Sequence, residues 1–530
     1  MLFVIDVGNT NTVLGVFDGE ELVHDWRIRT VIEHTVDEYG MLMYNLYKSS
    51  KISSKAIQHI IISCVVPPLQ PIFERTCEKL LRRTPLIVGP GIRTGMPIRV
   101  DNPREVGADR IVNAVATVER LGTPAIAIDF GTATSFDCIS SAGEFVGGAI
   151  FPGVFVALDL LVFFAFWEVM LVPMYFIIGI WGGKRRIYAT MKFVLFTLAG
   201  SLLMFVAILF ASGVHARTTG ILSFSLLEWI PAASSGAWGL TAAQSGLLFW
   251  AFAVAFLVKV PLWPLHTWLP DAHVEAPTGG SIILAGVLLK LGTYGLLRFA
   301  IPLFPGAAAR YTPLIAVLAL VGVVYGAWVA AAQKDMKKLV AYSSVSHLAL
   351  VVLGIFAGNV TAVSGAVMQM VGHGLTTGLL FLLVGVLYER RHTREMADYG
   401  GVASQVPVTT TLFVIAVLGS VGLPGLNGFV GEFLILAGVF KANVAWAAVA
   451  ATGLILGAIY LLTLVQKVFW GPNRVKANLG LTDINGWEFA GAFPMIVLVV
   501  VLGVWPQPVL DLVRNSVETV VQIAAVRMVP

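Results

Sequence analysis

The sequence predicts a mixed fold, in which an α/β unit over residues 1–153 precedes an all-α bundle of about ten membrane helices over residues 154–530. The charge distribution is the first reason. The first 153 residues carry 14 Lys/Arg and 17 Asp/Glu, whereas the remaining 377 carry only 21 and 14. The second reason is a mean hydropathy of +0.83 with 57% hydrophobic residues, which lies far outside the range of soluble domains. The apolar runs after residue 154 reach the roughly 20 residues that a bilayer-crossing helix needs.

The first unit contains two similar strand–turn–strand segments. An apolar strand over residues 2–6 leads into the polar turn 6–12, and a second strand over 124–128 leads into the turn 129–134. Both turns have the form Asp-x-Gly with threonine close behind. Glycine lets a backbone approach a ligand closely, and exposed N–H and hydroxyl groups can hold phosphate oxygens. The alternative is a pair of ordinary hairpins with Asx capping.

Charge and cysteine usage exclude several classes of function. The net charge is −3 for the first unit and +7 for the second, and neither value indicates nucleic-acid binding. The three cysteines lie in the first unit at unrelated spacings (Cys64, Cys77 and Cys138). This spacing favours a reducing compartment over a disulfide framework or a metal site.

Four motifs of the first unit together resemble the type III pantothenate kinases: residues 6–13, 63–67, 101–110 and 129–134. The resemblance implies an actin-like fold built from RNase H-like domains. Because that family continues beyond the motif that ends at Gly153, the resemblance also implies a C-terminally truncated kinase domain. It implies the phosphorylation of pantothenate, the first step of coenzyme A biosynthesis.

The same resemblance implies a role for each matching residue. ATP would be bound by one set of residues, namely Asp6, Gly8, Asn9, Thr10, Asn11, Thr12, Val13 and Thr132. Pantothenate would be bound by Gly107, Ala108, Asp109 and Arg110, with Asp109 as the proton acceptor for its hydroxyl. Asp129 would hold a monovalent cation, potassium or ammonium. Phosphoryl transfer does require a base near the attacking hydroxyl and donors around the phosphates, although Asp109 could instead form a surface ion pair with Arg110.

The second unit contains ten candidate spans: 154–180, 187–212, 241–263, 277–300, 311–333, 337–357, 361–388, 408–440 (interrupted), 446–469 and 488–506. Loop Lys and Arg residues then fall unevenly on the two sides of the membrane. Thirteen lie on one side, in the groups 184–192, 334–338, 390–394 and 467–476, and six lie on the other. The positive-inside rule makes the first side cytoplasmic. The same topology places residues 1–153 outside, whereas a kinase of the resembling family would be cytoplasmic.

Six ionisable residues lie inside these apolar spans: Glu168, Lys259, Lys290, His347, His373 and Glu432. A charge at membrane depth costs several kcal/mol unless it is paired or hydrated, and such residues mark ion and proton pathways. For any single residue the alternative is snorkelling to the interface or, for a histidine, a packing role. Six together favour a proton path.

Helix-breaking residues interrupt two spans, at 259–264 and at 419–428. Broken helices in corresponding halves are typical of inverted-repeat transporters. Lys259 and Glu432 lie next to these breaks. A nearby Glu favours the charged form of a buried Lys, so a Glu168–Lys259 pair could switch the lysine between two states.

Segments 260–278, 288–295 and 342–347 resemble the antiporter-like subunits of NADH-quinone oxidoreductase (respiratory complex I), and segments 166–175 and 422–433 point to subunit M. The resemblance covers residues 154 to 530 and implies an N-terminally truncated membrane domain. It makes Glu168, Lys259, Lys290 and Glu432 the proton-channel residues and places His347 and His373 on a central polar axis. It implies no cofactor in this half, with the lipid bilayer and the other complex I membrane subunits as partners.

The sequence leaves three interpretations open. The first is a proton-translocating subunit fused to a partial kinase, in the multi-pass setting of a bacterial inner membrane. The second is a chain whose first unit still phosphorylates pantothenate. The third is a stand-alone cation/proton antiporter.

Overall fold

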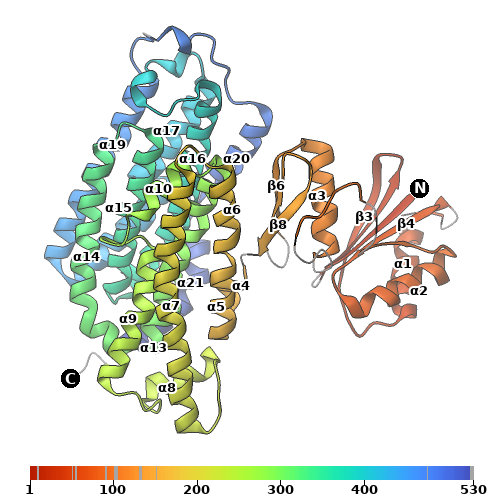
Figure 1. Cartoon of the computed structure of the whole chain (residues 1–530), viewed down its shortest axis with the longest axis horizontal. Helices are drawn as coiled ribbons and strands as arrows, with labels where there is room; N and C mark the ends of the chain where they lie inside the picture. The colour runs from red at the N-terminus through yellow and green to blue at the C-terminus, as the bar shows by residue number, and fades with distance from the viewer. Residues whose placement is uncertain are drawn as a thin grey trace. The chain divides into compact units, whose positions relative to one another are not determined.

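The computed structural model describes residues 1–530 except residues 9–10, 51, 54–55, 90–91, 93, 101–105, 131–133, 151, 474 and 526–530. The chain divides into two compact units, Met1–Gly153 and Val154–Pro530 (Figure 1).

The first unit contains two sheets. The larger has the strand order β3-β2-β1-β4-β5, in which β1, β4 and β5 are parallel and β2 and β3 join antiparallel. Its strands are β1 (Leu2–Val7), β2 (Asn11–Asp18), β3 (Glu21–Arg29), β4 (His59–Cys64) and β5 (Leu86–Val88). The smaller is an antiparallel meander of β6 (Ala125–Phe130), β7 (Thr134–Ile139) and β8 (Phe145–Ile150).

Helices cover these sheets because alternate strand residues are apolar. Phe3, Ile5 and Val7 on one face of β1 are buried with Tyr39 and Phe73 from α1 and α2, as a period of two along a strand requires. α3 packs against β6 and β7. The helices are α1 (Val36–Ser49), α2 (Gln70–Leu81), α3 (Ala108–Leu121) and the short α4 (Pro152–Val156) at the junction. The predicted α/β fragment is confirmed.

The second unit is almost entirely helical (Figure 1). Its first helices are α5 (Leu160–Val169), α6 (Leu171–Trp181), α7 (Arg186–Thr219), α8 (Leu226–Ser235), α9 (Ala242–Lys259), α10 (Trp268–Glu275), α11 (Thr278–Ile283), α12 (Leu289–Gly295) and α13 (Ile301–Leu303). They are followed by α14 (Pro305–Ala331), α15 (Met336–Phe356), α16 (Val360–Arg391), α17 (Pro407–Val421), α18 (Asn427–Ala442), α19 (Val444–Phe469), α20 (Gly486–Val504) and α21 (Gln507–Ala525).

Nine helical segments of the described chain are long and apolar enough to cross a membrane, and α17 with α18 forms the tenth, interrupted passage. Both predicted breaks are present, between α9 and α10 and between α17 and α18. The first passage begins at Leu160 rather than at residue 154. The reason is a capping aspartate, since the Asp159 carboxylate accepts hydrogen bonds from Leu161 N and Val162 N and so starts α5.

Two features were not predicted. The passage Thr278–Leu303 contains two π-helical segments, Leu284–Leu288 and Leu296–Ala300, and single π turns inside α-helices are frequent at functional sites. A further helix, α21, follows the last predicted span and packs against α16.

Helices α16 and α18 approach each other so closely that only glycine fits at one contact. A Cβ atom at Gly438 would lie 2.5 Å from the Ala362 Cβ, whereas a Cβ at Gly491 would meet nothing within 4 Å. Small residues allow membrane helices to pack in this way. We therefore expect Gly438→Ala to destabilise the membrane unit by about 1–3 kcal/mol through overpacking. Thermal unfolding in detergent measures this loss, and Gly491→Ala is the matched control that should not lower the midpoint, because alanine is favoured over glycine in an exposed helix position.

Asp483, in the loop before α20, holds the start of α17. Its carboxylate accepts hydrogen bonds from Val408 N (2.7 Å), Thr409 N (2.9 Å) and Thr409 Oγ1 (2.6 Å). Partial burial raises the pKa of Asp483, but these hydrogen bonds and one from Ile484 N outweigh it and lower the pKa below its usual value. The carboxylate thus acts as an N-cap supplied from a distant loop.

This contact predicts a pH-dependent stability. Because the folded-state pKa of Asp483 is depressed, its stabilisation is complete above the usual Asp pKa of about 3.9 and is lost as pH falls through the lower folded value. Asp483→Ala should lower the free energy of unfolding by about 1 kcal/mol at pH 7. Denaturation at pH 7 and below pH ~3 checks this prediction. The free energies of unfolding of the parent and the variant should differ only at the higher pH. An equal difference at both values would contradict it.

Candidate functional site

Four of the predicted residues form one buried polar line in the membrane unit. Lys290 Nζ lies 2.7 Å from His373 Nδ1 and also donates a hydrogen bond to the Ala285 carbonyl. Lys290 sits on α12, two residues after the end of the first π-helical segment, and His373 sits on α16. The two helices therefore bring together residues 83 positions apart in the sequence.

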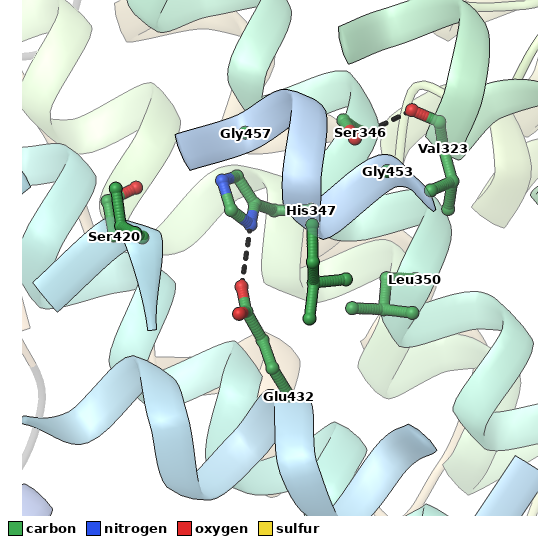
Figure 2. A pocket seen from close by; sticks show the side chains of 10 residues that line it. Val323, Ser346, His347, Leu350, Ser420, Glu432, Gly453 and Gly457 are labelled. Carbon is green, nitrogen blue, oxygen red and sulfur yellow. Dashed lines mark hydrogen bonds and ion pairs between the residues drawn. The ribbon is translucent and has the colours of Figure 1, made fainter. Parts of the chain in front are cut away.

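The line continues through His347 on α15 to Glu432 on α18. The ring centroids of His373 and His347 are 5.9 Å apart, so the two imidazoles are neighbours. His347 Nδ1 lies 3.1 Å from Glu432 Oε1, as Figure 2 shows. We call the set Lys290, His373, His347 and Glu432 the central line; all four residues are buried.

The break between α17 and α18 positions Glu432. Gly422 ends α17 with φ +81, a left-handed conformation that favours glycine. A Cβ at this position would lie 2.5 Å from Glu432 Oε2. The glycine at the break therefore leaves room for the Glu432 carboxylate. A residue with a side chain at position 422 would collide with it.

A small cavity of about 10 Å³ adjoins the end of the central line (Figure 2). Its lining includes His347, Glu432, Ser346 and Ser420. This volume is close to that of a single water, and the polar lining suits one. The cavity can therefore hydrate the His347–Glu432 contact.

Lys259 and Glu168 form a second, separate site. Lys259 Nζ and Glu168 Oε1 are both buried without a hydrogen-bond partner in the described chain, and the carboxylate attracts the ammonium electrostatically. Lys259 Nζ lies 5.0 Å from the centroid of the Trp167 ring, within cation–π range. Among the described residues, no hydrogen bond or ion pair joins this pair to the central line.

Sequence reasoning missed three buried polar residues of the membrane unit. Gln369 Nε2 donates to Glu432 Oε1 at 3.2 Å; its position one helical turn before His373 is a signal that could have found it. His273 belongs to a motif already noted, but no role was given to it. Lys337, placed by the sequence in a cytoplasmic loop, is buried in the first turn of α15.

The ATP-site residues of the first unit lie around the turn between β1 and β2. Asp6 is the last residue but one of β1 and lies opposite Val13, and Gly8 N donates to the Asn11 carbonyl. The Thr12 hydroxyl is buried against Thr30 Oγ1 at 2.9 Å, so it faces β3. Asn9, Thr10 and Thr132 lie outside the described residues.

The pantothenate-site residues begin α3. Gly107 is its N-cap, Ala108 is buried, and the Asp109 carboxylate accepts a hydrogen bond from Arg110 N. The Arg110 guanidinium pairs with buried Asp137 of β7 at 2.6 Å, a partner that sequence reasoning did not name. Asp129, the candidate cation ligand, lies in β6 opposite Ser135.

The membrane unit matches a known family model. The model described as NADH:quinone oxidoreductase/Mrp antiporter, TM matches residues 157–457, which include every residue of the central line. The chain belongs to this antiporter family. A second model, type III pantothenate kinase, matches residues 2–165, as expected for a fusion.

Individual relatives of the chain agree with its assignment to this antiporter family. NADH-quinone oxidoreductase subunit M of Rhodobacter capsulatus is 48% identical over 71% of the chain and 73% of its own length. A chain of respiratory complex I from Thermus thermophilus with bound NADH has a TM-score of 0.64 and 39% identity, over 71% of this chain and 76% of that one. A chain of the Mrp complex from Dietzia sp. DQ12-45-1b, with a TM-score of 0.61 and 18% identity, shares the fold.

Proposed function

We propose that residues 154–530 are a proton-translocating, subunit M-like membrane subunit of an NADH-quinone oxidoreductase in a bacterial inner membrane. The central line carries this proposal. Four buried ionisable groups that are neighbours of one another are costly in a membrane, and such groups mark ion and proton pathways.

The central line offers a stepwise route for a proton. Lys290 and His373 are close enough to share one directly, at 2.7 Å. His373 and His347 are neighbours, with ring centroids 5.9 Å apart, and we propose that the proton passes between them directly or through a water. It then reaches the Glu432 carboxylate through the His347 contact. A histidine can accept a proton on one ring nitrogen and release one from the other, so each step leaves the relay able to repeat.

The Glu168–Lys259 pair is the proposed switch beside this route. Each of its charged groups lacks a hydrogen-bond partner in the described chain, so the two are poised between pairing and separation. In a dry environment a small change in their distance alters their attraction strongly. We propose that electron transfer from NADH to quinone, carried out in other subunits, drives this change.

The test is NADH-driven proton uptake into inside-out membrane vesicles. Vesicles that contain the full chain should take up protons when NADH is oxidised by quinone, and vesicles from a strain without it should take up fewer protons per NADH. Equal ratios would rule out the proposed function. Exchange of Na⁺ for protons without NADH would favour the stand-alone antiporter instead.

The match to the type III pantothenate kinase model supports the description of the first unit as a kinase-like domain. We propose that this domain descends from a kinase that bound ATP, pantothenate and a monovalent cation. We propose further that the present chain does not convert these substrates. The pairing of Arg110 with Asp137 supports this proposal, because it occupies the guanidinium that would bind pantothenate.

A further inference from the structure

Gln369 on α16 is a buried amide of which only one end is paired. The residue is 3% exposed. Its Nε2 donates a hydrogen bond to Glu432 Oε1 at 3.2 Å, whereas its Oε1 is buried without a hydrogen-bond partner in the described chain. Nearly all buried polar atoms in proteins are hydrogen-bonded, so an unpaired amide oxygen beside an ionisable group needs an explanation.

The paired end of the amide meets the oxygen of Glu432 that faces His347. Glu432 Oε1 lies 3.1 Å from His347 Nδ1 (Figure 2), so one oxygen contacts both side chains. A carboxylate oxygen has two lone pairs and can accept from both at once. The other oxygen, Oε2, faces Gly422, where a Cβ atom would lie 2.5 Å from it. The amide of Gln369 therefore holds Oε1, rather than Oε2, against His347.

A structural tie between α16 and α18 is the competing explanation for Gln369. Two other amides already join these helices, one before and one after Gln369 along α16. Asn359 Nδ2 donates to the Gly438 carbonyl at 2.8 Å, and Asn427 Nδ2 donates to the Gly372 carbonyl at 3.2 Å. The two helices also pack closely at Gly438. They are thus held together without Gln369, which leaves its contact with the carboxylate available for another role.

The unpaired end of the amide lies over Gly431 of α18. A Cβ atom at Gly431 would lie 2.5 Å from Gln369 Oε1 and 2.8 Å from Gln369 Cβ, so a larger residue would displace the amide. Rotation about the terminal bond of a glutamine is soft, and with glycine at this position a half-turn can exchange the amide oxygen for the nitrogen. Gln369 can therefore donate to a charged carboxylate and accept from a protonated carboxyl group.

We propose that Gln369 is a positioning residue for proton transfer to Glu432: it holds Oε1 of the carboxylate against His347 and stays bound to the carboxyl group after the proton has arrived. In the transfer, the His347 imidazolium loses its Nδ1 proton to Glu432 Oε1, which leaves a neutral imidazole and a neutral carboxyl group, with no further reactant. The half-turn then presents Gln369 Oε1 to the new O–H group. This role rests on the proposed function and adds to it the residue that orients the proton acceptor.

The contact of Gln369 with the carboxyl group can be measured without electron transfer. In the infrared spectrum of the purified full-length chain, the bands of the Glu432 carboxyl group are those that disappear in Glu432→Gln. A hydrogen bond weakens the carbon–oxygen bond of its acceptor, so the same subtraction in a Gln369→Met background should place these bands at different frequencies. Gln333→Met, which removes an amide bonded to the Val329 carbonyl of α14, should leave them in place. Unchanged bands in Gln369→Met would overturn the positioning role.

Two substitutions of similar size separate positioning from a tie between helices. Gln369→Met removes the amide, and Gln369→Glu replaces it by a second carboxyl group, which still links the helices through a proton that it shares with Glu432 but traps that proton. Misplacement by about 1 Å can cost 10²-fold in rate, so both variants should lose about 10²-fold of the proton uptake that depends on this chain. Full uptake in either variant would contradict the positioning role, and a loss confined to Gln369→Met would show a tie. Absent NADH-driven uptake in the parent vesicles would refute the proposed function, and the infrared bands would still decide the role of Gln369.

Discussion

Replacing Lys290 by methionine should abolish the proton translocation that depends on this chain. Lys290 starts the central line and contacts His373 directly at 2.7 Å. Without an amine there, no other described side chain lies within hydrogen-bonding distance of His373 to pass it a proton. Loss of a positioned acid–base group costs about 10²–10⁴-fold in rate, so NADH-driven uptake through this subunit should fall below detection.

The fold should survive this change. Methionine has a similar length, and a lysine at membrane depth is itself costly to bury, so its removal should leave the membrane unit folded. Lys441→Met is the matched control, because Lys441 is exposed at the end of α18 and should leave proton uptake unchanged. Proton uptake and thermal unfolding are measured on the same membranes. Normal uptake in a folded Lys290→Met variant would show that the central line does not carry protons.

The residues of the central line could be predicted from the sequence because the bilayer imposes a simple rule. Few ionisable groups are tolerated at membrane depth, so Lys290 inside its apolar span and Glu432 after a Gly/Pro break stand out. The two helix breaks follow from local signals, since proline removes a backbone donor and glycine weakens a helix, and both residues are concentrated at these two points of the sequence.

The partners within the line could not be predicted, because they depend on packing between distant segments. Lys290 meets His373 only because α12 and α16 are neighbours, and the preceding π-helical segment carries no sequence pattern that separates it from an α-helix. The sequence placed Lys337 in a loop, which was wrong for a related reason. Its basic neighbours indicate a loop, but the Asp335 cap starts α15 early enough to bury its side chain.

In the first unit, too, the local features could be predicted from the sequence and the long-range contacts could not. Strand alternation and Asp-x-Gly turns predicted its hairpins, which are local. The ion pair of Arg110 with Asp137 joins α3 to β7 across 27 residues, and only the tertiary structure reveals it.

Purified full-length chain should show no pantothenate-dependent phosphate transfer from ATP. Phosphoryl transfer relies on positioning, with little covalent chemistry contributed by the protein. In the described first unit, the second sheet has three strands and packs against α3, and Arg110 is held by Asp137. Misplacement of about 1 Å can cost 10²-fold in rate, so a binding site built on this small sheet should give no detectable turnover.

The assay follows ADP release in the presence and absence of pantothenate, with Asp109→Asn as the matched variant. Asp109 is the residue that would accept the hydroxyl proton, so a real kinase activity must fall when it is replaced. We expect the parent and Asp109→Asn to be indistinguishable. Asp137→Asn extends the test, because weakening the pair frees Arg110. If that variant acquires pantothenate-dependent turnover while the parent has none, the ion pair rather than the size of the sheet prevents catalysis.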